Sequence, residues 1–150
     1  MMEPILLDQQ LCFSIYQTHK VFNHFYSKAL EPFHLTYSQY IVMLVLWEQG
    51  QLSVKELGLC VGLDSGTLTP LLKRLEREGW IIRKRSKMDE RRLEVILTDK
   101  AKAQRTEVYE HVGSCIDQIG LEFEQYQKIK AEVEELQEHL KAATAATKKE

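Results

Sequence analysis

The residues of this 150-residue chain that are best suited to covalent chemistry are three cysteines, Cys12, Cys60 and Cys115. No two of them have the C-x-x-C spacing of a zinc site or a dithiol oxidoreductase, so each would act as a single thiol. A single thiolate can attack a peroxide, form a sulfenic acid and condense with a second thiol. His19 and His24 have no partners at metal-ligand spacing, so we expect no metal.

A thiol-dependent peroxidase or reductase is one alternative for such residues. It would need a C-x-x-C pair, a cofactor-binding loop or an acid/base constellation, none of which the sequence contains. We therefore expect neither an enzyme nor a cofactor.

Cys12 is the thiol whose predicted position favours reactivity. Asp8 is predicted to cap a helix that ends at Pro32, and Cys12 would lie about one turn inside this helix. The positive end of the helix dipole favours thiolate over thiol there. Cys60, between Leu59 and Val61, is expected to pack in the core instead.

A second kind of chemistry, phosphate binding, is indicated by the charge distribution. Residues 64–92 contain nine Lys/Arg and five Asp/Glu, a net charge of +4, whereas the whole chain carries −2 and the remainder therefore −6. A basic segment between acidic flanks is typical of a chain in which one module faces nucleic acid.

Within this segment, residues 65–78 form a predicted helix that is capped by Asp64 and stopped by Gly79. Its leucines fall on one face, whereas the opposite face begins with small residues and ends with cations. A DNA recognition helix needs this order, because small residues let the backbone approach base edges and cations neutralise phosphates. The candidate DNA-binding residues are Ser65, Gly66, Thr67, Thr69, Pro70, Lys73, Arg74 and Arg77.

The residues after this helix predict a β-hairpin with a charged tip. Residues 80–85 and 93–97 have strand patterns and flank the polar stretch 86–92. Arg85, Asp89 and Arg91 are its candidate DNA-binding residues, because the Asp89 carboxylate could orient the Arg91 guanidinium toward a minor groove. A basic hairpin that serves only solubility is the alternative.

The remaining elements needed to position these residues are helical. A helix starts at Thr36 or Tyr37 and stops at Gly50, a short one starts at a Ser53/Glu56 capping box, and two more cover about 99–118 and the residues from 122, fraying after Lys141. The sequence thus predicts a mainly α fold with a small β-hairpin: a single domain over 1–150, with a winged helix-turn-helix at about 37–98.

The terminal helices, at about 8–31 and 99–141, have apolar faces that a small domain leaves uncovered, so we expect them to dimerise two copies of the chain. The longest apolar run, Ile41 to Trp47, is far shorter than the roughly 20 residues of a membrane span, and residues 1–7 do not have the pattern of a secretory signal. We expect a cytoplasmic protein without a membrane partner.

Two segments resemble the multiple-antibiotic-resistance (MarR) family of bacterial regulators: D-E-R-R-L-E-V-I-L-T at 89–98 and L-D-S-G-T-L-T-P-L-L-K-R-L-E at 63–76. The chain departs from the family at Ala101, where Gly is common. The resemblance implies that Asp89 and Arg91 make the wing's minor-groove contact and that the terminal helices form a homodimer interface.

Within that family, Q-L-C-F at 10–13, Tyr26 and L-T-Y-S-Q-Y at 35–40 resemble the organic-hydroperoxide-resistance (OhrR) branch. This resemblance implies that Cys12 is the reactive cysteine, that Tyr26 and Tyr37 hydrogen-bond it, and that Cys115 is a resolving thiol. The expected function is that of a transcription regulator, and we expect it to be a repressor. It would bind pseudo-palindromic operator DNA when reduced and release it when organic hydroperoxides oxidise Cys12. The alternative is a regulator of the same fold that a small aromatic ligand releases.

Overall fold

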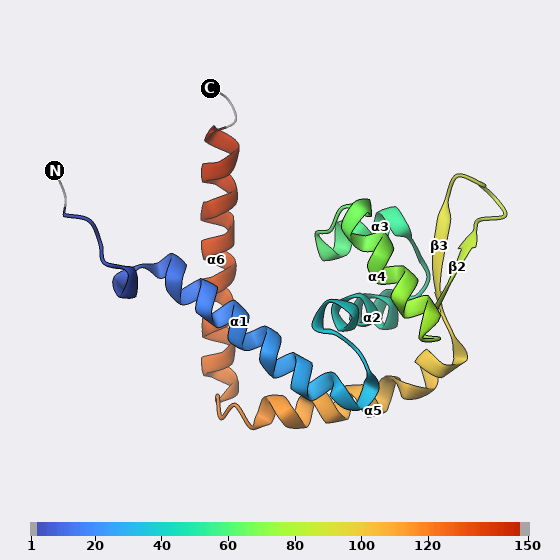
Figure 1. Ribbon diagram of the computed structural model, residues 1–150, viewed down its shortest axis with the longest axis horizontal. Helices are drawn as coiled ribbons and strands as arrows, with labels where there is room; N and C mark the ends of the chain where they lie inside the picture. Colours follow the sequence, from blue (N-terminus) through green and yellow to red (C-terminus); the bar gives the residue numbers. More distant parts are fainter. Residues whose placement is uncertain (1–2, 148–150) are drawn as a thin grey trace. The chain divides into compact units, whose positions relative to one another are not determined.

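The computed structural model describes residues 3–147, which form six α-helices, a small three-stranded sheet and two short 3₁₀ turns (Figure 1). The chain divides within its fifth helix into two compact units, one up to Val112 and one from Gly113 onward. The predicted fold class, mainly α with a small β-hairpin, is confirmed. The expected division into dimerisation helices and a winged helix stays a prediction.

The first unit begins with the 3₁₀ turn Leu7–Gln9 and contains most of the elements. They are α1 (Leu11–Leu30), the 3₁₀ turn Glu31–Phe33, α2 (Tyr37–Gln49), β1 (Leu52–Ser53), α3 (Val54–Val61), α4 (Ser65–Arg77), β2 (Ile81–Arg85), β3 (Leu93–Leu97) and the greater part of α5 (Asp99–Asp117). The second unit contains the end of α5 and α6 (Phe123–Thr147).

Side-chain caps fix where α2, α3 and α4 begin. Thr36 and Ser53 each form a complete capping box with the Gln or Glu three residues on. Asp64 Oδ1 accepts the backbone N–H of Thr67 at 2.8 Å and so caps α4. Each bond satisfies a donor that the first turn of a helix leaves unpaired, which is why these starts were predictable.

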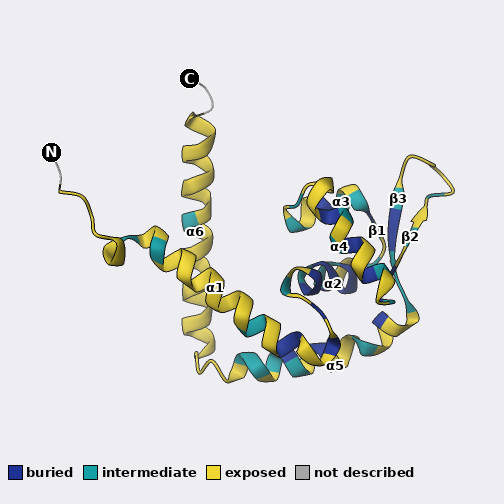
Figure 2. Ribbon diagram, in the orientation of Figure 1, coloured by how far each residue is buried: buried dark blue, intermediate teal, exposed yellow. Residues whose placement is uncertain are grey.

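The core of the first unit lies between α2, α3, α4 and the sheet (Figure 2). Leu46 of α2, Leu57 of α3, Leu72 of α4 and Val95 of β3 are all fully buried. These apolar side chains leave water together, and this is the main force that holds the helix-turn-helix on the hairpin.

The sheet has the strand order β1-β3-β2, and both pairings are antiparallel. β2 and β3 are the expected hairpin, paired in register from Ile81 with Leu97 to Arg85 with Leu93. β1 was not predicted, because two residues carry no periodic pattern. It places Ser53 opposite Glu94 and so brings the start of α3 beside the hairpin, close to its loop.

Three sequence predictions are wrong. Asp8 does not cap α1: it lies in a separate 3₁₀ turn, and Gln10 precedes α1 without a side-chain cap. Cys60 is exposed rather than buried. The last helix continues to Thr147 instead of fraying after Lys141, because the four alanines at 142, 143, 145 and 146 have the highest helix propensity.

Each unit leaves large apolar side chains in water. On α1 these include Leu11, Ile15 and Phe22, and on α6 they include Phe123 and Leu140. The structure thus contains the uncovered faces on which the dimer prediction depends. Among residues 3–147, no helix is both long enough and apolar enough to cross a membrane.

Candidate DNA-binding surface and thiol site

The predicted recognition helix α4 presents its small and basic residues on its exposed side. Leu68, Leu72 and Leu75 are fully buried beneath it. Thr69 is half-buried, and the other seven candidates are exposed, namely Ser65, Gly66, Thr67, Pro70, Lys73, Arg74 and Arg77. The helix is continuous through Pro70. The structure therefore brings the α4 candidates to one surface.

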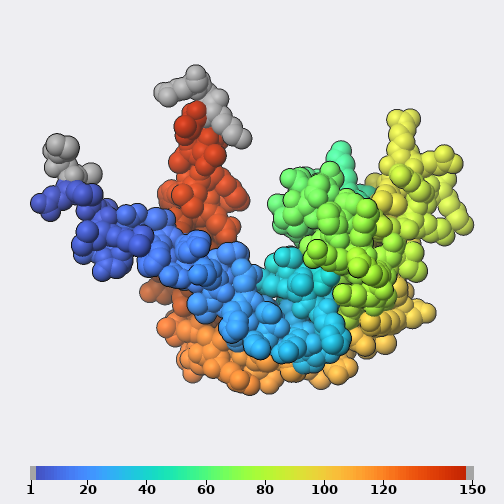
Figure 3. All heavy atoms as spheres, viewed as in Figure 1, coloured from blue at the N-terminus to red at the C-terminus, as the bar shows by residue number. Residues whose placement is uncertain are grey.

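The hairpin formed by β2, β3 and residues 86–92, called the wing below, projects from the first unit beside α3 and α4 (Figure 3). Its loop is held by its own hydrogen bonds: Ser86 N–H donates to the Arg92 carbonyl at 2.8 Å and Arg92 N–H to the Asp89 carbonyl at 2.9 Å. Arg85 Nη1 also donates to the Glu90 carbonyl at 3.3 Å. These hydrogen bonds give the wing loop a defined conformation, and the exposed cations of the wing lie on it and beside it.

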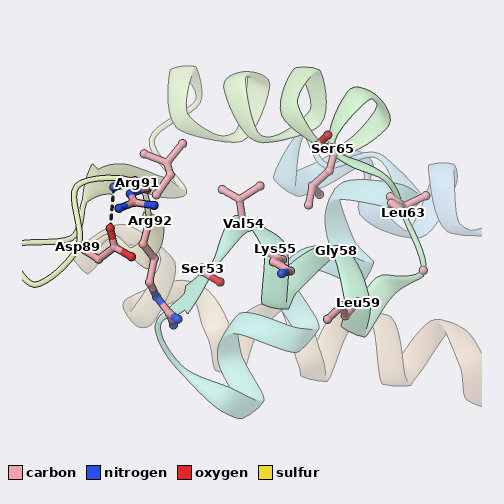
Figure 4. A pocket seen from close by; sticks show the side chains of 13 residues that line it. Ser53, Val54, Lys55, Gly58, Leu59, Leu63, Ser65, Asp89, Arg91 and Arg92 are labelled. Carbon is pink, nitrogen blue, oxygen red and sulfur yellow. Dashed lines mark hydrogen bonds between the residues drawn. The ribbon is translucent and has the colours of Figure 1, made fainter.

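Asp89 positions Arg91 in a different way from the one expected. Its Oδ1 accepts the backbone N–H of Arg91 at 3.0 Å, and no ion pair joins the two side chains within residues 3–147 (Figure 4). An Asp side chain often bonds the backbone N–H two residues on, because this closes a compact turn. Asp89 therefore shapes the loop, and the Arg91 side chain is exposed.

One ion pair ties the wing to α4. Glu76 Oε2 accepts the backbone N–H of Arg83 at 2.7 Å, and its Oε1 accepts from Arg83 Nη2 at 3.2 Å. The backbone hydrogen bond, and then the bond from the guanidinium, lower the pKa of Glu76 below its ordinary value. Sequence reasoning missed this pair, because no periodicity relates the end of a helix to a position in the following strand.

A cavity of about 930 Å³ opens between α3, the start of α4 and the wing (Figure 4). Its walls are apolar at Val54, Leu59 and Leu63, and Arg91 and Arg92 line its wing side. The expected DNA-binding residues Ser65, Asp89 and Arg91 thus share one concave part of the surface.

The candidate sensor Cys12 is the second residue of α1 and is exposed. Its Sγ lies 3.3 Å from Gln10 Oε1, to which the thiol donates. Cys115 is half-buried in the part of α5 that belongs to the second unit.

The two predicted thiolate-supporting tyrosines lie together in an aromatic cluster. The ring centroids of Tyr26 in α1 and Tyr37 in α2 are 4.3 Å apart, with the planes inclined by 7°. Tyr40 stacks on Tyr26 at 5.9 Å. Burial, and then the neighbouring tyrosines Tyr26, Tyr109 and Tyr37, raise the pKa of Tyr40 to about 12, so Tyr40 stays protonated at physiological pH.

Cys12 and Tyr26 of one chain are far apart. Both lie in the straight run of α1, separated by fourteen residues, and at 1.5 Å of rise per residue this is about 21 Å along the helix axis. Tyr37 stacks on Tyr26 and therefore lies at the same distant end of α1. A hydrogen bond from either hydroxyl to Cys12 thus requires the cysteine of another copy of the chain.

Comparison with known proteins relates more than half of the chain to a single family. The family model of the transcriptional regulator SarA/Rot matches residues 24–108, which contain the whole winged helix but neither Cys12 nor Cys115.

Two curated relatives have informative names. The HTH-type transcriptional regulator TtmR of Methylorubrum extorquens is 52% identical over 100 residues, 67% of this chain and 51% of TtmR. The organic hydroperoxide resistance transcriptional regulator of Bacillus subtilis is 46% identical over 93 residues, 62% of this chain and 63% of that regulator. The matches therefore span between half and two thirds of the length of these relatives.

Among solved structures, reduced AbfR bound to DNA is 42% identical, with a TM-score of 0.82, and the match covers 91% of this chain and 94% of AbfR. AbfR of Staphylococcus epidermidis was also solved over-oxidised and bound to DNA, and in a disulfide-formed state, with TM-scores of 0.76 and 0.66. The resemblance inferred from residues 63–76 and 89–98 is confirmed by these matches. The chain belongs to the SarA/Rot family of transcriptional regulators and has the DNA-binding winged helix of MarR-type proteins.

Proposed function

We propose that two copies of this chain form a dimer that binds pseudo-palindromic operator DNA when reduced and releases it when an organic hydroperoxide oxidises Cys12. The observation that carries the proposal is an exposed cysteine in the first turn of α1, in a chain whose α4 and wing present basic side chains. The name of the Bacillus subtilis relative and the existence of a disulfide-formed state of AbfR support it.

The dimer is supported by the separation of about 21 Å between Cys12 and Tyr26 along one α1 helix. If the tyrosines bond the thiol, Cys12 of one protomer must meet Tyr26 and Tyr37 of the other. The exposed apolar side chains Leu11, Ile15 and Phe22 of α1 would then be covered by the partner chain. Two symmetry-related α4 helices can enter successive major grooves.

The oxidation chemistry requires a hydroperoxide and two thiols. The Cys12 thiolate attacks the terminal peroxide oxygen, the O–O bond breaks, and an alcohol leaves while Cys12 becomes a sulfenic acid. Cys115 of the partner then attacks the sulfenic sulfur, a disulfide forms, and water leaves. Over-oxidised AbfR was solved with DNA, so we assign release to the disulfide rather than to oxygen on the sulfur alone.

The wing contributes to affinity through Arg91, and replacing this residue by alanine is expected to weaken operator binding by about 1–3 kcal/mol. The side chain is exposed beside α4 on an ordered loop, so its loss removes a groove contact without unfolding the wing. Fluorescence anisotropy with a labelled duplex measures the affinity. The affinity should also fall steeply as salt rises, because phosphate contacts release counterions. A neutral Arg91→Ala, or binding that ignores salt, contradicts the wing contact.

The redox function is tested by the same anisotropy assay on the wild type. Reduced protein should bind the upstream duplex, an excess of cumene hydroperoxide should release it, and dithiothreitol should restore binding. Protein that stays bound after Cys12 has been oxidised to the disulfide would contradict the proposal.

A second candidate function is release by a small aromatic ligand, with Cys12 inert. The cavity of about 930 Å³ favours it, because apolar walls and the exposed Arg91 suit an aromatic anion. Release by benzoate together with insensitivity to cumene hydroperoxide would favour this alternative.

A further inference from the structure

Arg92, next to the proposed DNA contact Arg91, is the centre of an ion-pair network where the wing loop meets β3. Its Nη2 lies 2.8 Å from Glu56 Oε1 in α3, and its Nε lies 2.5 Å from Glu94 Oε1 in β3. The Glu94 side chain is 11% exposed, whereas those of Arg92 and Glu56 are 44% and 43% exposed. The guanidinium thus faces two carboxylates of its own chain, one of which is nearly buried.

Glu56 joins this network to the start of α3. Its second oxygen, Oε2, accepts the backbone N–H of Ser53 at 2.9 Å and completes the capping box. Ser53 is also the β1 residue that pairs with Glu94. The Ser53 backbone bond, followed by the bond from Arg92, lowers the pKa of Glu56, so its carboxylate is ionised near neutral pH. One carboxylate therefore fastens the wing to the first helix of the helix-turn-helix.

The anchored Arg92 constrains the neighbouring residue. The Arg92 backbone makes two hydrogen bonds across the wing loop. Its N–H donates to the Asp89 carbonyl, and its carbonyl accepts from the Ser86 N–H. Figure 4 shows Arg91 and Arg92 leaving the wing in different directions, with Arg92 running down the hairpin toward Ser53. When Arg92 is held by Glu56 and Glu94, the backbone next to it is held as well, and with it the direction in which Arg91 leaves the loop.

We propose that Arg92 is a positioning residue for DNA binding: its ion pairs with Glu56 and Glu94 hold the wing against α3 and so set the direction of the Arg91 side chain. The inference rests on the proposed Arg91 contact. In this proposal Arg92, although basic, does not bind phosphate. Glu56, although acidic, favours the binding of DNA.

Because the proposed effect of Glu56 on DNA affinity is opposite to the effect of its charge, Glu56→Gln is the decisive variant. Glutamine can also complete a capping box, so the start of α3 is kept, but the ion pair with Arg92 is lost. General electrostatics alone predicts tighter DNA binding, because the variant removes a negative charge from the DNA-binding unit. Positioning predicts the opposite, an operator affinity that is about threefold to tenfold lower, as expected for the loss of a partly exposed charged bond.

Glu90→Gln is the matched control. It makes the same charge change in the wing loop, and Glu90 forms no ion pair within the part of the chain that the structure describes. Its affinity should be unchanged or higher. Thermal unfolding of both variants should show that the winged helix remains folded.

A double-mutant cycle separates this inference from the proposal on which it rests. In the Arg91→Ala background, Glu56→Gln should have almost no further effect, because the side chain that it positions is gone. Equal or higher affinity of the single variant Glu56→Gln, or an equal loss in both backgrounds, overturns the positioning role while leaving the Arg91 contact intact. If instead Arg91→Ala leaves the operator affinity unchanged, Arg91 makes no contact with DNA, and the proposal on which this inference rests is wrong.

Discussion

Cys12→Ser is expected to bind the operator with an affinity within about twofold of the wild type and to remain bound when cumene hydroperoxide is added. Serine occupies nearly the same volume, and Cys12 is exposed, so the reduced fold should not change. The nucleophile is lost, so no sulfenic acid can form at this position. The effect is large, because reversing a 99:1 balance between bound and released states takes about 5.5 kcal/mol.

The measurement is anisotropy of the labelled duplex before and after oxidation, with Cys60→Ser as the matched control. Cys60 is an exposed thiol as well, so its variant tests whether any accessible cysteine would serve. It should release DNA like the wild type. A Cys12→Ser protein that still dissociates on oxidation excludes Cys12 as the trigger.

Cys115→Ser is expected to abolish the covalent dimer that mild oxidation of the wild type produces on a non-reducing gel. The disulfide needs a second thiol to attack the sulfenic acid, and Cα atoms within about 7 Å, so the oxidised dimer must bring Cys115 of one protomer to Cys12 of the other. Without that thiol, and with no small thiol in the sample, Cys12 persists as a sulfenic acid or over-oxidises. Because the disulfide is the proposed cause of release, we expect the variant to keep its DNA under oxidation.

The pattern across three variants tests this pairing. The reducible dimer should be absent in Cys12→Ser and in Cys115→Ser and present in Cys60→Ser. A wild type that stays monomeric on the gel while it loses DNA would remove Cys115 from the mechanism. A small-thiol adduct on Cys12 would then be the better explanation.

Most of the fold could be predicted because its signals are local. Thr36, Ser53 and Asp64 cap helices within three residues of themselves. Gly62 adopts a left-handed φ of 68° just after α3 and allows the tight turn into α4. The apolar spacing in α4 placed its leucines in the core, so its exposed face could be named from the sequence.

The errors arose where several weak signals compete. Asp8 is a good capping residue, but it lies inside the short 3₁₀ turn Leu7–Gln9, and α1 begins only at Leu11. Cys60 is flanked by apolar residues, yet the side of α3 that carries Leu59 and Cys60 faces water. Neither outcome follows from the local pattern alone.

Long-range contacts in the candidate site were beyond sequence reasoning. Glu56 and Arg92 are thirty-six positions apart, and their ion pair depends on β1, a strand of two residues. The resemblance supplied Tyr26 and Tyr37 as proposed partners of Cys12, and only the length of α1 shows that such a contact would need the cysteine of another copy of the chain.

The most direct test follows release and oxidation in the same samples. Operator-bound protein is titrated with cumene hydroperoxide, anisotropy gives the fraction of DNA released, and mass spectrometry of peptides gives the fraction of Cys12 in the disulfide with Cys115. The two fractions should rise together and reach completion at about one hydroperoxide per subunit, since each sulfenic acid consumes one peroxide. Complete disulfide formation with DNA still bound, or complete release while Cys12 remains a thiol, would contradict the account.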